Sequence, residues 1–283
     1  AAPKPPGNSI DRCQRLAMVV SGASPTFLKP LRPWGVGPRN AEHAVRFALR
    51  QLVDVLKVRN EAGQPYLLIG GQAVNYWAGR YLADEPELNA WLPFTSEDID
   101  FQGQRTDVEW ISRQLGLKAV YPHRVEMTAL AGCVPFRMGE ARSNIEVVRS
   151  LPGLTVHEIE QTAFDAEFEG QRIRVLDPVS LLWCKATLTT KVPQSGRRDA
   201  DHVRIMVVCV RAFLRETLRA VAKGELPIRG WLGAVERVHG QQVEDAEHKI
   251  DLEERQRQQL PAWGQPLAQR VPHRRRPQQP RGQ

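Results

Sequence analysis

The stretch TSEDIDFQG, residues 95–103, places two aspartates inside an otherwise apolar, β-prone run. Side chains alternate between the faces of a strand, so Asp98 and Asp100 share one face while Ile99 and Phe101 share the other. The bulky apolar pair predicts that its face is buried in a core. The two like charges repel each other, so we expect either a cation or water between them. For an isolated acidic pair, a solvated strand face is the alternative.

Strand and helix signals surround this stretch and predict a mixed α/β arrangement. Asn40 is a suitable N-cap for a long amphipathic helix over residues 41–58, where apolar residues recur near helical spacing. YLLIGG, residues 66–71, is typical of a short buried strand that ends in two glycines, and a helix over 72–82 follows it. Residues 83–96 contain two prolines and few periodic features, which predicts a loop insertion.

The pattern then changes from strands to helices. A helix is expected over 107–117. Five short strands are expected after it, over 118–122, 132–138, 144–151, 162–168 and 171–177. Asp177 as N-cap, with Pro178 at the first helical position, is a start signal for a helix over 179–190. Further helices are expected over 198–222 and 229–239. The chain therefore divides into a Pro-rich arm (1–40), an α/β domain (41–176), a helical domain (177–240) and a charged, Gln- and Arg-rich tail, disordered at its end (241–283).

Basic charge is concentrated at the end of the sequence. The 283 residues carry a net charge of +7, and five arginines with no acid fall within residues 261–283. The remaining residues are therefore nearly balanced, at +2. An arginine-rich segment of this kind favours contact with the phosphates of a polyanion such as RNA.

Cysteine usage and hydropathy exclude several classes of protein. The four cysteines form no CxxC pair, so neither a zinc site nor a disulfide framework is indicated. Free cysteines fit a reducing cytoplasm, which is the expected location. The apolar stretch LAMVVSGA, residues 16–23, is too short to span a membrane, so no membrane association is expected.

Two further features of the α/β half could carry chemistry. Gly70 and Gly71 stand at a strand-to-helix junction, where backbone N–H groups and the positive end of the helix dipole favour a phosphate. A simple turn is the alternative. Glu146 is a lone acid among β-branched residues, and an edge-strand charge is the alternative there. A third carboxylate beside the two aspartates would complete a two-metal site, whose ions lie ~3.5–4 Å apart.

Charged residues in the helical half form the last candidate group. Lys185 lies among apolar residues, so its amine either extends to solvent or points into a polar site. Arg197 and Arg198 precede Asp199 and Asp201. Residues two apart on a helix diverge by about 200°, so at most one of these aspartates can face a common site.

Five segments, taken in order, resemble the nucleotidyltransferase superfamily of the polymerase-β type: LLIGGQAV, TSEDIDF, NIEVV, VLDPVSLLWCKATL and RRDADHVRIM. The likeness is greatest to the bacterial group related to the AbiEii toxins of type IV toxin–antitoxin systems, and it covers residues 41–220. It implies an α/β (α+β) fold with a small mixed sheet flanked by helices, followed by a helical C-terminal domain. It also implies transfer of a nucleoside monophosphate from an NTP to an acceptor hydroxyl, with release of pyrophosphate.

The resemblance implies a role for each acidic residue and glycine of the candidate site. The pair Gly70 and Gly71 would cradle the triphosphate. Asp98 and Asp100 would hold Mg²⁺, with two ions expected. Glu146 would be the third metal-binding acid and would help to activate the acceptor hydroxyl.

Lys185 is similar to the lysine that neutralises triphosphate charge, and Asp199 to the acid that follows it in this group. Three features depart from the common pattern of the superfamily. The third acid is Glu rather than Asp, the second glycine stands where many relatives have Ser, and 26 residues separate Gly71 from Asp98. The long spacing predicts an insertion that borders the acceptor site.

The sequence leaves the acceptor open. The toxin-like relatives and the arginine-rich tail favour RNA, in particular a tRNA 3′ end, and the resemblance implies a cognate antitoxin as a partner. An aminoglycoside-type hydroxyl compound and a protein hydroxyl are the alternatives. A non-catalytic relative that binds or regulates is the alternative from another class.

Overall fold

A seven-stranded mixed sheet forms the centre of the protein. The computed structural model describes residues 28–30, 45–123, 125–126, 128–194, 197–238 and 250. Along the sheet the strands are β1 (Leu28–Pro30), β4 (Leu130–Met138), β5 (Ala141–Val148), β3 (Ile99–Gln102), β2 (Leu67–Ile69), β7 (Gln171–Leu176) and β6 (Ala163–Phe168). β2 is parallel to β7 and β3 is parallel to β5, whereas all other neighbours are antiparallel.

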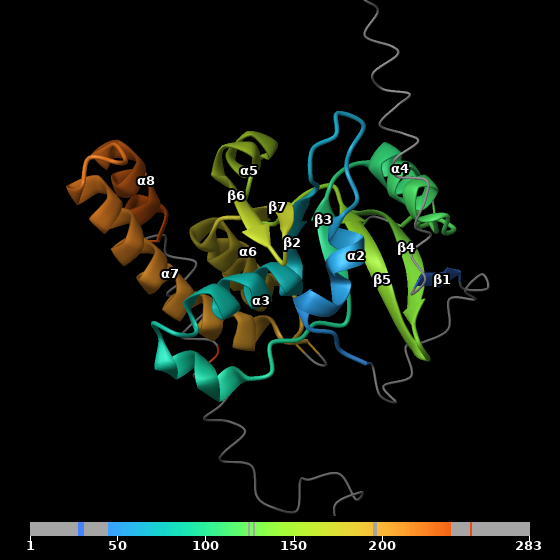
Figure 1. Ribbon diagram of the computed structural model, residues 1–283, viewed down its shortest axis with the longest axis horizontal. Helices are drawn as coiled ribbons and strands as arrows, with labels where there is room; N and C mark the ends of the chain where they lie inside the picture. The colour runs from blue at the N-terminus through green and yellow to red at the C-terminus, as the bar shows by residue number, and fades with distance from the viewer. Residues whose placement is uncertain are drawn as a thin grey trace, which may run out of the picture.

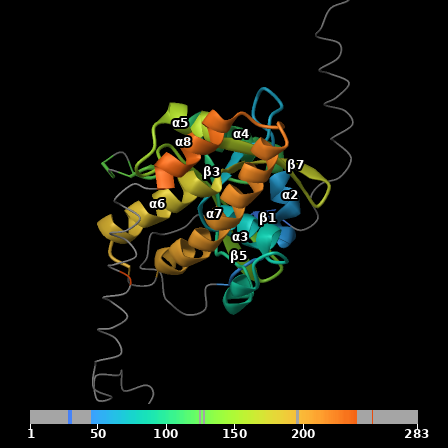
Figure 2. The same cartoon turned by 90° about the vertical axis from the view of Figure 1, so that its left-hand side faces the viewer.

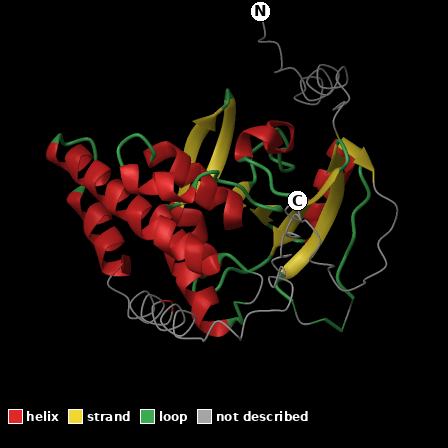
Figure 3. Ribbon diagram, turned by 90° about the horizontal axis from the view of Figure 1, so that it is seen from below, coloured by secondary structure: helices red, strands yellow, loops and turns green. Residues whose placement is uncertain are grey.

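Helices flank the sheet and continue beyond it. They are η2 (Leu49–Leu52), α2 (Val53–Leu56), α3 (Gly70–Tyr81), η3 (Pro86–Trp91), α4 (Arg105–Leu115), α5 (Val156–Thr162), α6 (Pro178–Lys191), α7 (Asp199–Ala222) and α8 (Ile228–Val238). Figure 1 shows α6, α7 and α8 gathered on one side of the sheet, with α4 beside β4 on the other. Figure 2 looks onto α7 and α8, and Figure 3 shows the same separation of helices and strands from below. The expected fold class, a mixed sheet flanked by helices and followed by further helices, is confirmed.

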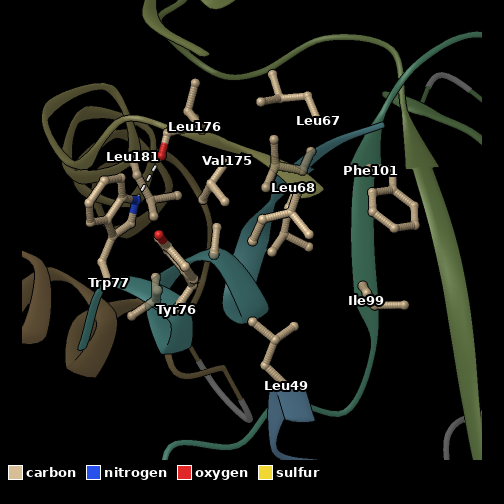
Figure 4. Packing of buried hydrophobic residues seen from close by; sticks show 14 of the residues in the cluster. Leu49, Leu67, Leu68, Tyr76, Trp77, Ile99, Phe101, Val175, Leu176 and Leu181 are labelled. Carbon is tan, nitrogen blue, oxygen red and sulfur yellow. Dashed lines mark hydrogen bonds between the residues drawn. The ribbon is translucent and has the colours of Figure 1, made fainter. Parts of the chain in front are cut away.

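Buried residues of α3, β2 and β7 belong to one hydrophobic core. Leu68 on β2 and Val175 on β7 have no exposed surface, and Trp77 on α3 is equally buried. The indole N–H of Trp77 donates a hydrogen bond to the carbonyl oxygen of Leu176 at 2.9 Å (Figure 4). A buried indole needs such a partner, and the bond ties α3 to β7. Since α3 begins directly after β2, the bond fixes the helix across both strands.

The start signal of α6 acts as expected. The Asp177 carboxylate accepts hydrogen bonds from the backbone N–H groups of Val179 and Ser180, and Pro178 occupies the first helical position. The predicted helices over 198–222 and 229–239 are confirmed as α7 and α8. α6 and α7 pack against each other, and α3 packs against α7. This packing brings the start of α7 close to the start of α3.

The predicted long helix over 41–58 is wrong in its described part. Residues 45–48 are not helical, and only the short η2 and α2 follow them. Phe47 and Ser96 exchange two backbone hydrogen bonds of 2.8 and 3.0 Å, and the Gln72 amide donates to the Phe47 carbonyl at 3.0 Å. These tertiary bonds hold the chain extended where its apolar spacing alone favours a helix.

Three smaller expectations also change. The insertion over 83–96 contains the 3₁₀ helix η3, and the strand predicted over 118–122 is reduced to one bridge between Val120 and Cys133. The helix α5 lies in a region expected to hold strands only, and Thr155 caps it.

Within the described residues no helix is both long and apolar enough to cross a bilayer. Except for residues 28–30 and Ile250, the predicted arm and tail lie outside the described residues.

Candidate active site

Neighbouring strands bring two of the predicted acids together. Asp100 on β3 stands directly opposite Glu146 on β5 in the parallel pair, and Figure 1 shows the two strands side by side. The apolar residues that flank each acid along its own strand are buried. Paired residues on adjacent strands project from the same face of a sheet. The alternation noted at Asp98–Phe101 therefore places both carboxylates on one face, and Glu146 is not on an edge strand.

Asp98 joins this pair from the residue before β3. The Asn144 side-chain amide donates a hydrogen bond to its Oδ1 at 3.2 Å. Cys133 lies on the other side of Glu146, in register with it on β4. Burial, with smaller contributions from the negative charges of Glu146 and Asp98, raises the pKa of the Cys133 thiol to about 11. Glu146 and Asp98 thus both lie close enough to Cys133 to act on its thiol.

The glycine pair fits tightly against this group. Gly70 has a φ of +66°, and a β-carbon there would overlap the Asp100 carboxylate. A β-carbon at Gly71 would overlap the hydroxyl of Ser96. The backbone N–H of Gly71 donates a hydrogen bond to Asp100. Each position therefore requires glycine, because a neighbouring side chain approaches the backbone closely. The N-terminus of α3 faces Asp100.

Lys185 and Asp199 form a buried ion pair beside the same site. Lys185 Nζ lies 2.9 Å from Asp199 Oδ1, and Arg197 Nε lies 2.6 Å from Oδ2. Burial opposes ionisation of Asp199, but the charges of Lys185 and Arg197 outweigh it and hold its pKa below the usual value. Asp201 is paired with Arg198 instead. Only one of the two aspartates on α7 faces the site, as helical geometry predicts.

Asp100 has an unusual electrostatic environment. The pKa of its carboxyl is raised to about 6: burial is the largest cause, Lys185 and the Gly71 backbone N–H limit the rise, and Asp98 and Asp199 contribute to it. An ionised Asp100 is therefore short of positive charge in this arrangement. A bound cation would supply that charge.

Two neighbours of the glycine pair carry no recognisable signal in the sequence. His202 follows Asp199 by three residues on α7, so the two share a helix face. Its Cε1 would lie 3.4 Å from a β-carbon at Gly71, and its buried Nδ1 has no hydrogen-bond partner among the described residues. Burial and the charge of Lys185 hold the pKa of His202 far below its usual value, so the imidazole is neutral at pH 7. Ser96, the other neighbour, lies in the predicted insertion.

The donor types, but not the side-chain positions, fit a magnesium site. Carboxylate oxygens are the ligands that Mg²⁺ prefers. Asp100 and Glu146 supply them from paired positions of one sheet, and Asp98 supplies them from the residue before β3. Within the described part of the chain, however, no three His, Cys, Asp or Glu side chains stand close enough to hold one ion. Rotation of these side chains would be needed to form such a site.

The raised pKa of Asp100 predicts a dependence of stability on pH. Between its unfolded value near 3.8 and its folded value of about 6, the folded protein retains a proton that the unfolded chain has lost. In the presence of EDTA, the free energy of unfolding should therefore fall by on the order of 2 kcal/mol as pH rises through this window. Asp100→Asn should lack this fall. Urea unfolding of both proteins at pH 4 to 7 measures it, and parallel curves would contradict the assignment.

Comparison with known proteins gives little further information. No family model matches the chain, and no curated protein matches it. Among solved structures, an antigenic nucleotidyltransferase-like protein from Paracoccidioides brasiliensis has 14% sequence identity and a TM-score of 0.35, over 58% of this chain and 72% of that one. A similarity at this TM-score carries no argument, so the geometry of the site is what bears on function.

Proposed function

We propose that the protein is a Mg²⁺-dependent nucleotidyltransferase that moves a nucleoside monophosphate from an NTP to an acceptor hydroxyl. The observation that carries the proposal is the register pairing of Asp100 with Glu146. It sets two carboxylates from distant segments beside Asp98 and next to the glycine-bounded start of α3. Phosphoryl-type transfer depends mainly on positioning and on neutralising charge, and this arrangement offers groups for both.

Positive groups beside the acids support a triphosphate site. The N-termini of α3 and α7 lie close together, because His202 approaches Gly71. Lys185 and Arg197 add two cations there, both bound to Asp199. Helix N-termini with adjacent cations favour phosphate groups. The triphosphate would therefore lie between the glycine pair and this cluster.

The three acids would act on the metal ion and on the acceptor hydroxyl. Asp98 and Asp100 would hold Mg²⁺, with Glu146 as the third acid; the ion, when bound, would neutralise phosphate charge. The acceptor oxygen would bond to the α-phosphorus as the bond to pyrophosphate breaks. Glu146 would take the proton of the acceptor hydroxyl.

A transfer assay tests the proposal. The protein is incubated with each of the four α-labelled NTPs, Mg²⁺, and either total RNA or an aminoglycoside mixture. We expect label to appear in one acceptor class only and to disappear with EDTA. Label in tRNA would extend the proposal to a toxin-like enzyme, and label in the aminoglycoside would identify an antibiotic-modifying enzyme. Absence of label from RNA, aminoglycoside and the protein itself would contradict transfer.

A non-catalytic nucleotide-binding protein is the second candidate. It is favoured by two observations: the three acids are not gathered into one metal site in the described residues, and Lys185 is bound to Asp199. Such a protein would bind an NTP without turnover. Equilibrium dialysis with labelled NTP, run beside the transfer assay, separates binding from reaction.

A further inference from the structure

A cleft on the outer face of α3 is separate from the acidic site. Its volume is about 670 Å³, within the range of ~300–1,000 Å³ that is usual for small-molecule sites. Residues from four segments line it: η2, one face of α3, the chain directly after η3, and the tip of the β6–β7 hairpin. The segment after η3 leads through Ser96 to the acidic pair. The lining of the cleft includes none of the three acids.

Gly79 exposes the backbone of α3 to this cleft. A glycine inside a helix costs about 1 kcal/mol relative to alanine, so it is disfavoured unless space is needed. A β-carbon at Gly79 would meet no atom within 4 Å. No protein group therefore requires the glycine, in contrast to Gly70 and Gly71. The missing side chain widens the cleft along one turn of the helix.

Aromatic and aliphatic groups form the apolar part of the lining. Tyr76 on α3 packs edge-on against Phe168 of the hairpin, with ring centroids 6.2 Å apart. Phe94 and Leu92 approach from the segment after η3, and Leu92 is 49% exposed. Aromatic faces attract cations as well as apolar groups. The lining thus suits a ligand that has an apolar body.

The charges of the lining favour a cation. Glu167 and Glu169 extend from the hairpin tip, and both are exposed. Two arginines also line the cleft, but the guanidinium of Arg80 is already bound to Glu216 on α7 at 2.6 Å. Among the described residues that line the cleft, Arg50 is the one cation without such an ion pair. Two carboxylates against one such arginine disfavour a polyanion and favour an amine.

We propose that this cleft is a binding site for a small amphipathic amine, with its apolar body against the aromatic side chains and its ammonium group toward Glu167 and Glu169. This goes beyond the transfer reaction proposed for the acidic site. Binding here needs neither Mg²⁺ nor an NTP, so it can be measured whether or not the protein is a nucleotidyltransferase.

Three probes of equal length test the chemistry: 4-phenylbutylamine, 4-phenylbutanol and 4-phenylbutyrate, titrated by calorimetry into the full chain without nucleotide. The amine should bind tightest, by about fivefold or more over 4-phenylbutyrate. All three probes share the apolar body, but of their polar groups only the ammonium is attracted by Glu167, Glu169 and the aromatic faces. Equal affinities, tighter binding of the carboxylate, or no binding by any probe would overturn the proposal.

Gly79→Leu tests the location, since its side chain would fill the cleft from a helix-compatible position. We expect it to weaken binding of the amine by about tenfold, with unchanged or raised thermal stability. Gly233→Leu is the matched control, because Gly233 is also a helical glycine with open space around it, on α8. Glu167→Gln combined with Glu169→Gln should remove the preference for amine over alcohol. Unchanged binding in the Gly79 variant would place the site elsewhere and overturn the proposal.

Discussion

Asp98→Asn and Asp100→Asn are each expected to lower Mg²⁺-dependent nucleotidyl transfer by about a thousandfold or more, without unfolding the protein. Asparagine keeps the size of the side chain and one acceptor oxygen, so the hydrogen bonds from Asn144 and from the Gly71 backbone can persist. What is lost is one negative charge next to the proposed ion. Initial rates at saturating NTP and Mg²⁺ measure the effect.

The stability of the Asp100 variant sharpens this prediction. Because burial disfavours the ionised carboxylate, Asp100→Asn should be at least as stable as the natural protein at pH 7 in EDTA. Loss of activity together with equal or greater stability is typical of a group retained for function. Asp165→Asn is the matched control: Asp165 is an exposed strand acid on β6 whose carboxylate lies 3.7 Å from Arg174. Full activity in both site variants would contradict the proposed role of the acids.

Local periodicity was sufficient to predict much of the site. Alternation over residues 98–101 gives the face of the two aspartates, and the apolar run before Gly70 gives the strand that delivers the glycines. The pairing of Asp100 with Glu146 is different, because register between strands depends on the whole sheet. Glu146 was a candidate as a lone acid among β-branched residues, and the resemblance to a family implied its role; neither observation could place it opposite Asp100.

Features that depend on tertiary contacts could not be predicted. Phe47 lies in an apolar pattern of helical type, yet its backbone pairs with Ser96, which is far away in sequence. His202 is one histidine in an amphipathic helix until α3 and α7 pack and bring it to Gly71. The cleft at Gly79 is lined by four separate segments. Each of these features is formed by contacts between distant parts of the chain rather than by local pattern.

Lys185→Met is expected to destabilise the protein by about 3 kcal/mol, because breaking a buried ion pair leaves an uncompensated charge. Asp199 is only 3% exposed and, among the described residues, would keep only the ion pair with Arg197, whose side chain is 42% exposed. Urea unfolding at pH 7 measures the loss. The methionine matches the length of the lysine stem, so the change removes the charge with little change in packing.

Combining Lys185→Met with Asp199→Leu separates the structural role of the pair from a functional one. With both charges gone, neither member of the pair leaves the other as an unpaired buried ion, and Arg197 is exposed enough to turn to solvent. Replacing a buried ion pair by apolar residues is often neutral, so the double variant should regain most of the stability lost in the single one. If Lys185 neutralises triphosphate charge, nucleotidyl transfer should remain lost in both variants, because stability returns without the cation. A double variant that regains transfer along with stability would show that the pair only supports the fold, and the triphosphate would then have to be held by the helix N-termini and the remaining arginines.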